Sequence, residues 1–127
     1  MKNRVGLGLS VMVGLLMVSG TLFAHHSNSL YDMEQVTTVT GTVVEFLWNN
    51  PHVTILLDAK GASGKVEKWT VELSPPSRLH RTGWNSAAIK AGDQITVTGN
   101  PGKDGRPRIS PRKMAVNGEV RNMGGQD

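Results

Sequence analysis

Two adjacent histidines, His25 and His26, follow an uncharged stretch and an alanine, and they are the residues best placed to do chemistry. If the chain is cut after Ala24, His25 offers an α-amino nitrogen and an imidazole, and His26 offers a second ring. An amine with a pKa of about 8 and imidazoles with pKa values of about 6.5 are largely available as neutral ligands near neutral pH. Nitrogen-rich sites suit Cu(II), which also has the highest affinity of the divalent series. The cut itself would therefore create a copper ligand.

His52 and His80 are the other two histidines of the chain. If the N-terminal segment folds back over the domain, His52 could supply a third metal ligand beside His25 and His26. The alternative is that both are hydrogen-bonded surface histidines, because His52 lies on an outward position and His80 lies close to two arginines. The sequence leaves both interpretations open, and copper is the one cofactor that it suggests.

A second group of residues could bind a ligand through rings, amides and a guanidinium. It comes from two separate parts of the chain and comprises Trp48, Asn50, His52, Arg81 and Trp84. Aromatic rings beside an arginine suit stacking on sugars or bases. The alternative is that the two tryptophans close the ends of a small hydrophobic core, because large aromatic side chains dominate such cores.

Motifs of catalysis are missing from the sequence. It has no nucleophile elbow, no phosphate-binding loop, no H-E-x-x-H pattern and no cysteine. Glu45, Glu67 and Glu72 alternate with apolar residues, as solvent-facing residues of strands do. We therefore expect the protein to bind a ligand or partner and not to be an enzyme.

Residues 1–24 have the composition of a secretory signal peptide. Met-Lys-Asn-Arg is followed by an uncharged run over 5–23 and then by the small residue Ala24. The alternative is an uncleaved membrane anchor, because the run approaches the ~20 residues that span a bilayer. The glycines and serines within the run favour cleavage, after which no stable membrane insertion is expected. This interpretation predicts a periplasmic or secreted protein.

The charge of the chain gives little support for a nucleic-acid partner. The formal net charge is +4, and it becomes smaller when Lys2 and Arg4 are removed with the leader. One basic cluster surrounds a Pro-rich turn and comprises Arg106, Arg108, Arg112 and Lys113. A solvated hairpin explains this cluster, so no nucleic-acid partner is expected. The roughly 100 residues that remain suffice for one domain, which must be held together by its core because it has no cysteines.

Five segments have the alternation or the β-branched content of strands. They are expected over 36–48, 52–59, 66–73, 93–100 and 108–118. In the first segment, the apolar positions change parity around Val43 and Val44, next to a glycine, as in a bulged and strongly coiled strand. In the last segment, Pro111 indicates an edge or a bulge.

The residues from Ser74 onward break this alternation and link the third and fourth strands. Pro75 and Pro76 end the third strand because proline cannot donate to a ladder. Ser77 is expected to cap one short helical turn, and Asn85 or Ser86 a second. Neither turn is long enough to be stable as an isolated helix.

The order β-β-β-α-β-β with a coiled first strand is that of an OB-fold, a small five-stranded barrel. The alternative is an open β-sandwich, which usually needs seven or more strands. The sequence thus predicts a mainly β protein with a signal peptide over 1–24, an N-terminal arm over 25–35, an OB-like barrel over 36–117 and a flexible tail over 118–127.

Five short motifs run through the chain from the cleavage point onward. They are "AHHS" at 24–27, "GTV.EF.W.NPH" at 41–52, "W.VEL" at 69–73, "L.R.GW" at 79–84 and "I..GD.ITVTG.P" at 89–101. In this order they resemble a family of small bacterial exported proteins classed as a domain of unknown function. The resemblance implies export and a single domain, but it implies no reaction.

These observations favour a monomeric, non-catalytic binding module for a small ligand or a periplasmic protein partner. On OB-folds, the second and third strands and the loops around them bind extended ligands. The alternative function is copper binding or copper handling through the mature N-terminal histidines.

Overall fold

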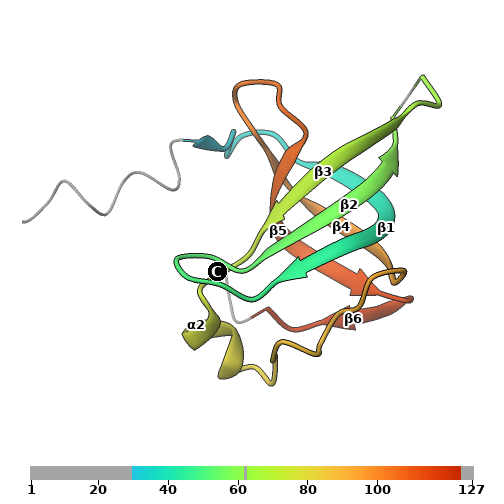
Figure 1. Ribbon diagram of the computed structural model, residues 1–127. Helices are drawn as coiled ribbons and strands as arrows, with labels where there is room; N and C mark the ends of the chain where they lie inside the picture. The colour runs from blue at the N-terminus through green and yellow to red at the C-terminus, as the bar shows by residue number, and fades with distance from the viewer. Residues whose placement is uncertain (1–29, 62, 124–127) are drawn as a thin grey trace, which may run out of the picture.

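The computed structural model describes residues 30–61 and 63–123. Six strands and one short helix follow one another along this part of the chain (Figure 1): β1 (Thr37–Leu47), β2 (Thr54–Lys60), β3 (Val66–Glu72), α2 (Pro76–His80), β4 (Gln94–Pro101), β5 (Arg108–Val116) and β6 (Glu119–Arg121). The predicted signal peptide and the two adjacent histidines lie outside the described residues.

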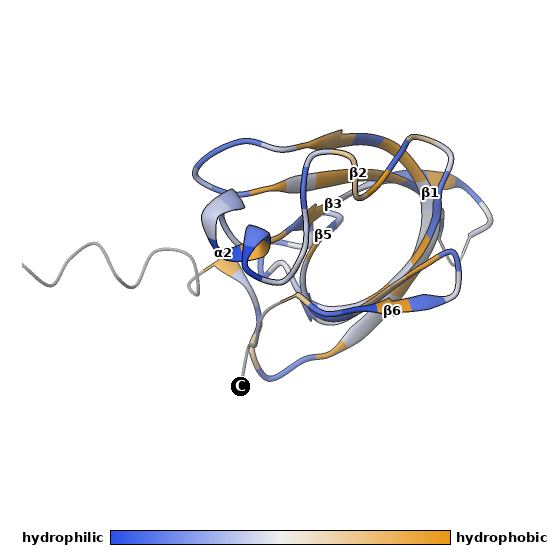
Figure 2. Ribbon diagram, turned by 90° about the horizontal axis from the view of Figure 1, so that it is seen from below, coloured by the Kyte–Doolittle hydropathy of each residue, from blue (hydrophilic) through white to orange (hydrophobic). Residues whose placement is uncertain are grey.

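The first five strands form a closed barrel, as the sequence pattern predicts. The sheet order is β3-β2-β1-β4-β5-β6, and a short parallel pairing joins β3 back to β5. That closing contact pairs Thr70 with Arg108 and Val71 with Ile109. Figure 2 shows the strands as a ring seen from one end. The mainly β, OB-like fold class with one helix between β3 and β4 is confirmed.

A bulge in β1 allows this one strand to serve two neighbours. The register with β2 places Val43 opposite Leu57 and Glu45 opposite Leu56, so Val44 is the extra residue. Before the bulge, Val39 and Val43 face the core, and after it Phe46 packs against the core. The change of parity in the sequence therefore has the cause that was predicted, because an unpaired residue bends and coils a strand.

The core lies inside the ring of strands and continues beneath the helical link. It consists of apolar side chains that are less than about a tenth exposed, most of them branched, including Val53, Ile55, Leu57, Val71, Leu79, Ile95, Val97, Ile109 and Met114. Leu79 enters this core from α2, and Trp84 and Ile89 enter it from the residues that follow. The link between β3 and β4 therefore covers one end of the barrel.

The link has a helical turn at the expected place, but its cap differs from the prediction. The helix begins at Pro76, with Pro75 at the N-cap and no side-chain cap hydrogen bond, so Ser77 lies inside the helix and does not cap it. Proline suits the first helical position because the amide that it lacks has no helical partner there. Asn85 does form a turn, since its Oδ1 accepts from the Ala87 amide at 2.8 Å.

The C-terminal segment contains a short strand where a flexible tail was expected. Glu119–Arg121 pairs with β5, with Met114 opposite Arg121 and Val116 opposite Glu119. The connecting Asn117-Gly118 turn has positive φ at both residues, at 50° and 85°. An Asn-Gly pair with these angles closes a tight β-hairpin, and this signal in the sequence was overlooked. Within residues 30–61 and 63–123, no helix is long and apolar enough to cross a membrane.

Candidate functional site

His52 lies on the loop between β1 and β2, two residues before β2 begins, and it is paired with a carboxylate. Its Nδ1 is 2.7 Å from Oε1 of Glu72, and the two side chains are 34% and 25% exposed. Backbone pairing continues past the strand ends, because the Leu73 amide donates to the Val53 carbonyl at 2.8 Å. His52 and Glu72 are therefore diagonal cross-strand neighbours, close enough for long side chains to meet.

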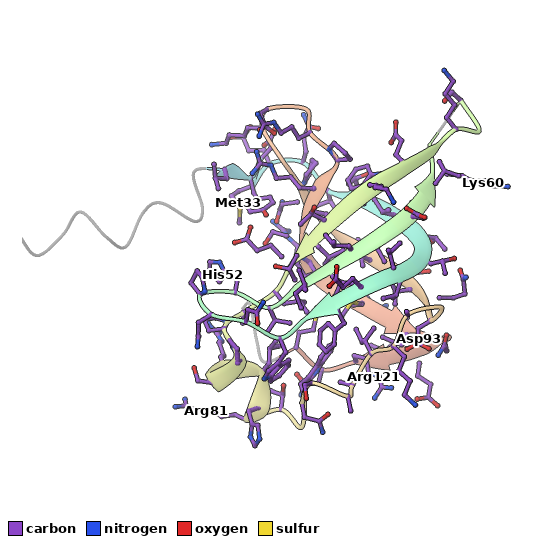
Figure 3. All side chains as sticks on the ribbon, viewed as in Figure 1. Met33, His52, Lys60, Arg81, Asp93 and Arg121 are labelled. Atoms are coloured by element: carbon purple, nitrogen blue, oxygen red, sulfur yellow. The ribbon has the colours of Figure 1, made fainter. Side chains whose placement is uncertain are left out.

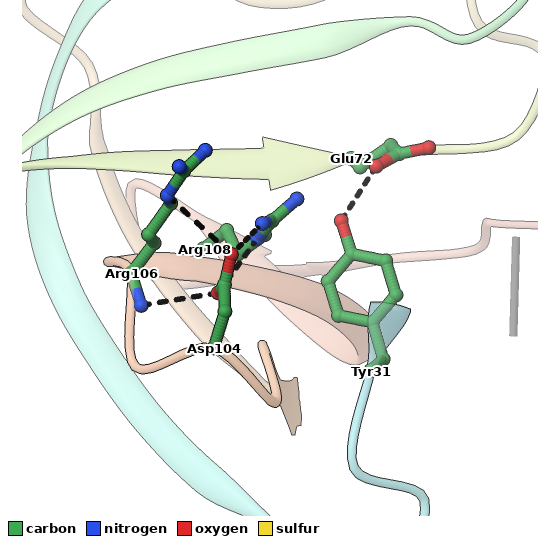
Figure 4. A network of polar contacts seen from close by, with 5 residues as sticks. All are labelled: Tyr31, Glu72, Asp104, Arg106 and Arg108. Carbon is green, nitrogen blue, oxygen red and sulfur yellow. Dashed lines mark hydrogen bonds and ion pairs between the residues drawn. The ribbon is translucent and has the colours of Figure 1, made fainter. Parts of the chain in front are cut away.

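The second oxygen of the same carboxylate holds the N-terminal arm. The Tyr31 hydroxyl donates to Glu72 Oε2 at 2.5 Å, across 41 residues of sequence, as Figure 4 shows. Tyr31 is only 4% exposed. Burial raises the pKa of the Tyr31 phenol, and the hydrogen bond to Glu72 raises it further. The phenol therefore stays protonated and acts as a hydrogen-bond donor.

Residues 30–35 of the predicted arm are attached to the barrel by backbone and side-chain contacts. Tyr31 forms a β-bridge with Gly102, and the Asp32 amide donates to the Pro101 carbonyl at 2.9 Å. Asn100, which is buried, donates through Nδ2 to the carbonyls of Asp32 at 3.0 Å and Gln35 at 2.6 Å. This part of the arm is therefore fixed beside the ends of β4 and β5.

The two tryptophans of the predicted ligand surface have different environments. Trp84 is 5% exposed, belongs to the core, and donates from Nε1 to the Asn122 carbonyl at 2.7 Å. Trp48 is half-buried, and its ring lies 5.9 Å from that of Phe46 in an edge arrangement. Phe46 in turn lies 6.4 Å from Trp84. For Trp84 the structure matches the alternative in which the ring closes a barrel end.

The remaining members of that surface lie in solvent. Asn50 is exposed on the loop that carries His52, and the Asn50–Pro51 peptide bond is cis. Arg81 is exposed at the end of α2, and Figure 3 shows it projecting from the helical link, apart from His52. Of the five predicted ligand-binding residues, the structure therefore places Trp48, Asn50 and His52 on one loop, whereas Arg81 and Trp84 belong to the link.

A small pocket lies beside Trp84, between the link and β6. It has a volume of about 210 Å³ and is lined by residues 82–84 and Ala88 on one side and by residues 120–122 on the other. Trp84 forms part of its wall, although little of the ring reaches solvent. The pocket is smaller than the 300–1,000 Å³ typical of sites for drug-sized ligands.

The basic cluster of the sequence is largely occupied by contacts within the protein. Arg106 lies 3.4 Å from an Asp104 oxygen, and Arg108 also pairs with Asp104 (Figure 4). Arg112 donates from Nε to Asn100 Oδ1 at 2.9 Å and from Nη2 to the Met33 carbonyl at 3.2 Å. Three of the four cations therefore help to hold the β4–β5 turn and the arm.

The histidines that were considered as metal ligands are divided between the described and the undescribed residues. His25 and His26 lie outside the described residues, whereas His52 lies beside Glu72 and His80 is exposed on α2. Over the described ranges, no three histidine, cysteine or acidic side chains come together as a metal site would need. A metal bound at His52 would thus need further donors from elsewhere.

Sequence reasoning missed Glu72, the partner of His52, and Tyr31, which donates to the same carboxylate. Glu72 was expected to face solvent, but its side chain is three-quarters covered, lies 2.7 Å from His52 Nδ1 and accepts a hydrogen bond from Tyr31, so that expectation is wrong. Tyr31 was assigned to the arm with no role. The usable signals were the shared outward parity of His52 and Glu72 on paired strands and the presence of one tyrosine just before the barrel.

The fold defines the class of this protein, a small OB-like barrel with an attached N-terminal arm. A family model described as a family of unknown function (DUF6152) matches residues 13–109, and the chain belongs to this family. No curated protein matches it. Among solved structures, it is similar to Rim1, a mitochondrial single-stranded DNA-binding protein of S. cerevisiae, with a TM-score of 0.48 and 8% identity over 72% of this chain and 96% of that one.

Proposed function

We propose that this protein is an exported, non-catalytic binding protein whose ligand is Cu(II), held by His25, His26 and His52. The observation that carries the proposal is the 2.7 Å contact between His52 Nδ1 and the Glu72 carboxylate. Histidines that bind metals almost always donate their other ring N–H to a carboxylate, a carbonyl or a water molecule. His52 has this arrangement, with one third of its side chain open to solvent.

The wider ligand surface expected from the sequence has less support. The Trp48 ring is half-buried and the Trp84 ring belongs to the core, so the two rings do not form one open surface for stacking. Binding at the loop of Trp48, Asn50 and His52 is retained in the proposal, because this loop presents the imidazole. A small-molecule ligand at the same loop would compete with copper for His52.

Titration with Cu(II) tests the proposal directly. We expect protein that begins at His25 to bind one Cu(II). Two altered forms, His25→Ala and a form with an extra N-terminal Met, should bind Cu(II) at least tenfold more weakly, because both change the nitrogen donors at the N-terminus. His80→Ala is the matched control, because His80 is an exposed histidine on α2. If the Met-extended form binds copper as tightly as the form that begins at His25, the free amine is not a ligand and the proposal is wrong.

A further inference from the structure

The pocket beside Trp84 lies between the link and the outer edge of β6. β6 is the last strand in the sheet order, so no strand of the described ranges pairs with this edge. The Trp84 indole N–H donates to the Asn122 carbonyl at 2.7 Å, which ties the link to the residue that follows β6. The two walls are therefore held together, and the fold itself sets the pocket volume of about 210 Å³.

The β6 wall presents a backbone amide at Val120. In a hairpin with a two-residue turn, the residues that flank the turn bond each other across the strands, and here these are Val116 and Glu119. Val120 then belongs to a non-hydrogen-bonded pair, so its amide points to the outer edge of β6. The carbonyl of Asn122, two residues on, points to the same edge and meets Trp84 there. The Val120 amide is therefore directed toward the link.

Arg121 adds a cation to the same wall. Its side chain is exposed, it lines the pocket, and it forms no hydrogen bond or ion pair with another described residue. Asp93, the acid that interacts with it electrostatically, uses its two side-chain oxygens for the Lys90 amide at 2.9 Å and Asn117 Nδ2 at 3.1 Å. The Arg121 guanidinium is therefore available to bind both oxygens of a carboxylate in one plane.

The link wall offers apolar surface and no spare amide. The amides of Thr82, Gly83 and Trp84 all donate to backbone carbonyls of the link. The Thr82 hydroxyl donates to the Leu79 carbonyl at 2.8 Å. Ala88, which is partly buried, completes this wall beside Trp84. A ligand must therefore place its hydrogen-bond acceptors on β6 and its apolar part against the link.

The charges of the link favour an anion at this end of the barrel. Residues 74–92 contain no aspartate or glutamate. They contain three permanent cations, which are Arg78, Arg81 and Lys90. A surface that carries one sign of charge raises the local concentration of ligands of the opposite sign. Figure 3 shows Arg81 and Arg121 at this same end but at separate positions, and Arg81 does not line the pocket.

The geometry points to a binding site for a small organic anion, a monocarboxylate with a short apolar body. The carboxylate contacts the Arg121 guanidinium and the Val120 amide, and the apolar body lies against Ala88 and Trp84. One guanidinium compensates one negative charge, and the link adds no further donor, so a carboxylate suits the site better than a phosphate does. The site shares no residue with the proposed copper site and goes beyond it.

Titration of the isotope-labelled exported protein with butyrate, followed by nuclear magnetic resonance, tests this inference. We expect butyrate to shift the amide signals of residues 82–84, 88 and 120–122 and the Trp84 indole signal, with a Kd on the order of 1 mM for so small a ligand. 1-Butanol, which lacks the carboxylate, and inorganic phosphate, which lacks the apolar body, should bind at least about tenfold more weakly. If either bound there as tightly as butyrate, the assignment to an organic carboxylate would be wrong.

Matched arginine variants test the role of the cation. We expect Arg121→Gln to weaken butyrate binding about tenfold, because it removes a charge-assisted pair of hydrogen bonds. Arg81→Gln removes an equally exposed arginine at the same end of the barrel and should leave the affinity unchanged. Equal butyrate affinities of these two variants would overturn the role of Arg121.

Matched alanine variants test the location of the site. Ala88→Leu places a larger side chain in the pocket wall, whereas Ala87→Leu changes an exposed neighbour outside it. We expect Ala88→Leu to abolish the butyrate shifts and Ala87→Leu to keep them. Unchanged binding by a folded Ala88→Leu protein would show that the pocket is not the site. If Ala88→Leu did not fold, the comparison of Arg121→Gln with Arg81→Gln would still decide.

Discussion

At the scale of single residues, two glutamates of the same strand have different environments in this protein. Glu67 and Glu72 both lie on β3, yet Glu67 is exposed whereas Glu72 is partly buried, accepts a hydrogen bond from Tyr31 and lies 2.7 Å from His52 Nδ1. Glu72 differs from Glu67 because it contacts two other segments: the Tyr31 hydroxyl donates to one of its oxygens, and His52 Nδ1 lies 2.7 Å from the other.

Trp84 is a second residue whose environment decides its role. Its ring is buried, and its indole N–H donates to the Asn122 carbonyl, which follows β6. We expect Trp84→Phe to lower the free energy of unfolding by about 1–2 kcal/mol, through the lost hydrogen bond and the smaller ring. Urea denaturation measures this change. Trp48→Phe is the control, because the half-buried Trp48 should lose less; an equal or larger loss at Trp48 would mean that Trp84 is not the main aromatic of the core.

At the scale of elements, β1 organises the barrel because it pairs with both β2 and β4. Its inward positions before and after the bulge line two parts of the same core. The strand can approach β2 closely because Gly41 has no side chain: a Cβ there would lie 2.6 Å from the Asp58 carbonyl oxygen and 3.1 Å from the Ala59 Cβ. The glycine is therefore required by close backbone approach.

Gly41→Ala tests this requirement. We expect it to destabilise the protein by about 1–3 kcal/mol, because the added methyl group meets backbone that cannot move without disturbing the β1–β2 ladder. The denaturation midpoint should fall while the m-value stays constant.

The matched control for this substitution is Gly61→Ala. A Cβ at Gly61 would lie 3.1 Å from the Glu67 side chain, which is exposed and flexible and can move aside. We expect a change close to zero. If the two alanine variants were equally destabilised, close packing of β1 on β2 would not be the reason for glycine at position 41.

At the scale of the whole molecule, the sequence predicts the elements better than the contacts between distant segments. Alternation in residues 52–59 and 66–73 predicts the burial of Ile55, Leu57 and Val71, because one strand face must be apolar when it covers a core. Pro111 coincides with a bulge, since the register of β4 with β5 shifts between Thr98 and Gly99, opposite it. These features follow from local rules.

The site depends on contacts between segments that are far apart in the sequence, which strand alternation and proline positions do not predict. The contact of Tyr31 with Glu72 spans 41 residues and arises from the path of the arm, which Asn100 and Arg112 fix through carbonyl groups. Carbonyls are common to all residues, so such contacts leave no mark in residue types. His52 could be named from its chemistry, but its carboxylate partner could be identified only from the strand register.

The predicted cleavage after Ala24 connects the whole molecule with its proposed site, because the α-amino nitrogen of His25 exists only if the leader is removed. We expect the protein recovered from the periplasmic fraction to have a mass below the 13.7 kDa of the full chain by the mass of residues 1–24, with His25 as its first residue. Intact-mass spectrometry of the fractionated protein measures this. A species of 13.7 kDa that sediments with lipid would show that the leader stays as an anchor. The terminal amine would then be that of Met1, and a site at His25 would lose one of its nitrogen donors.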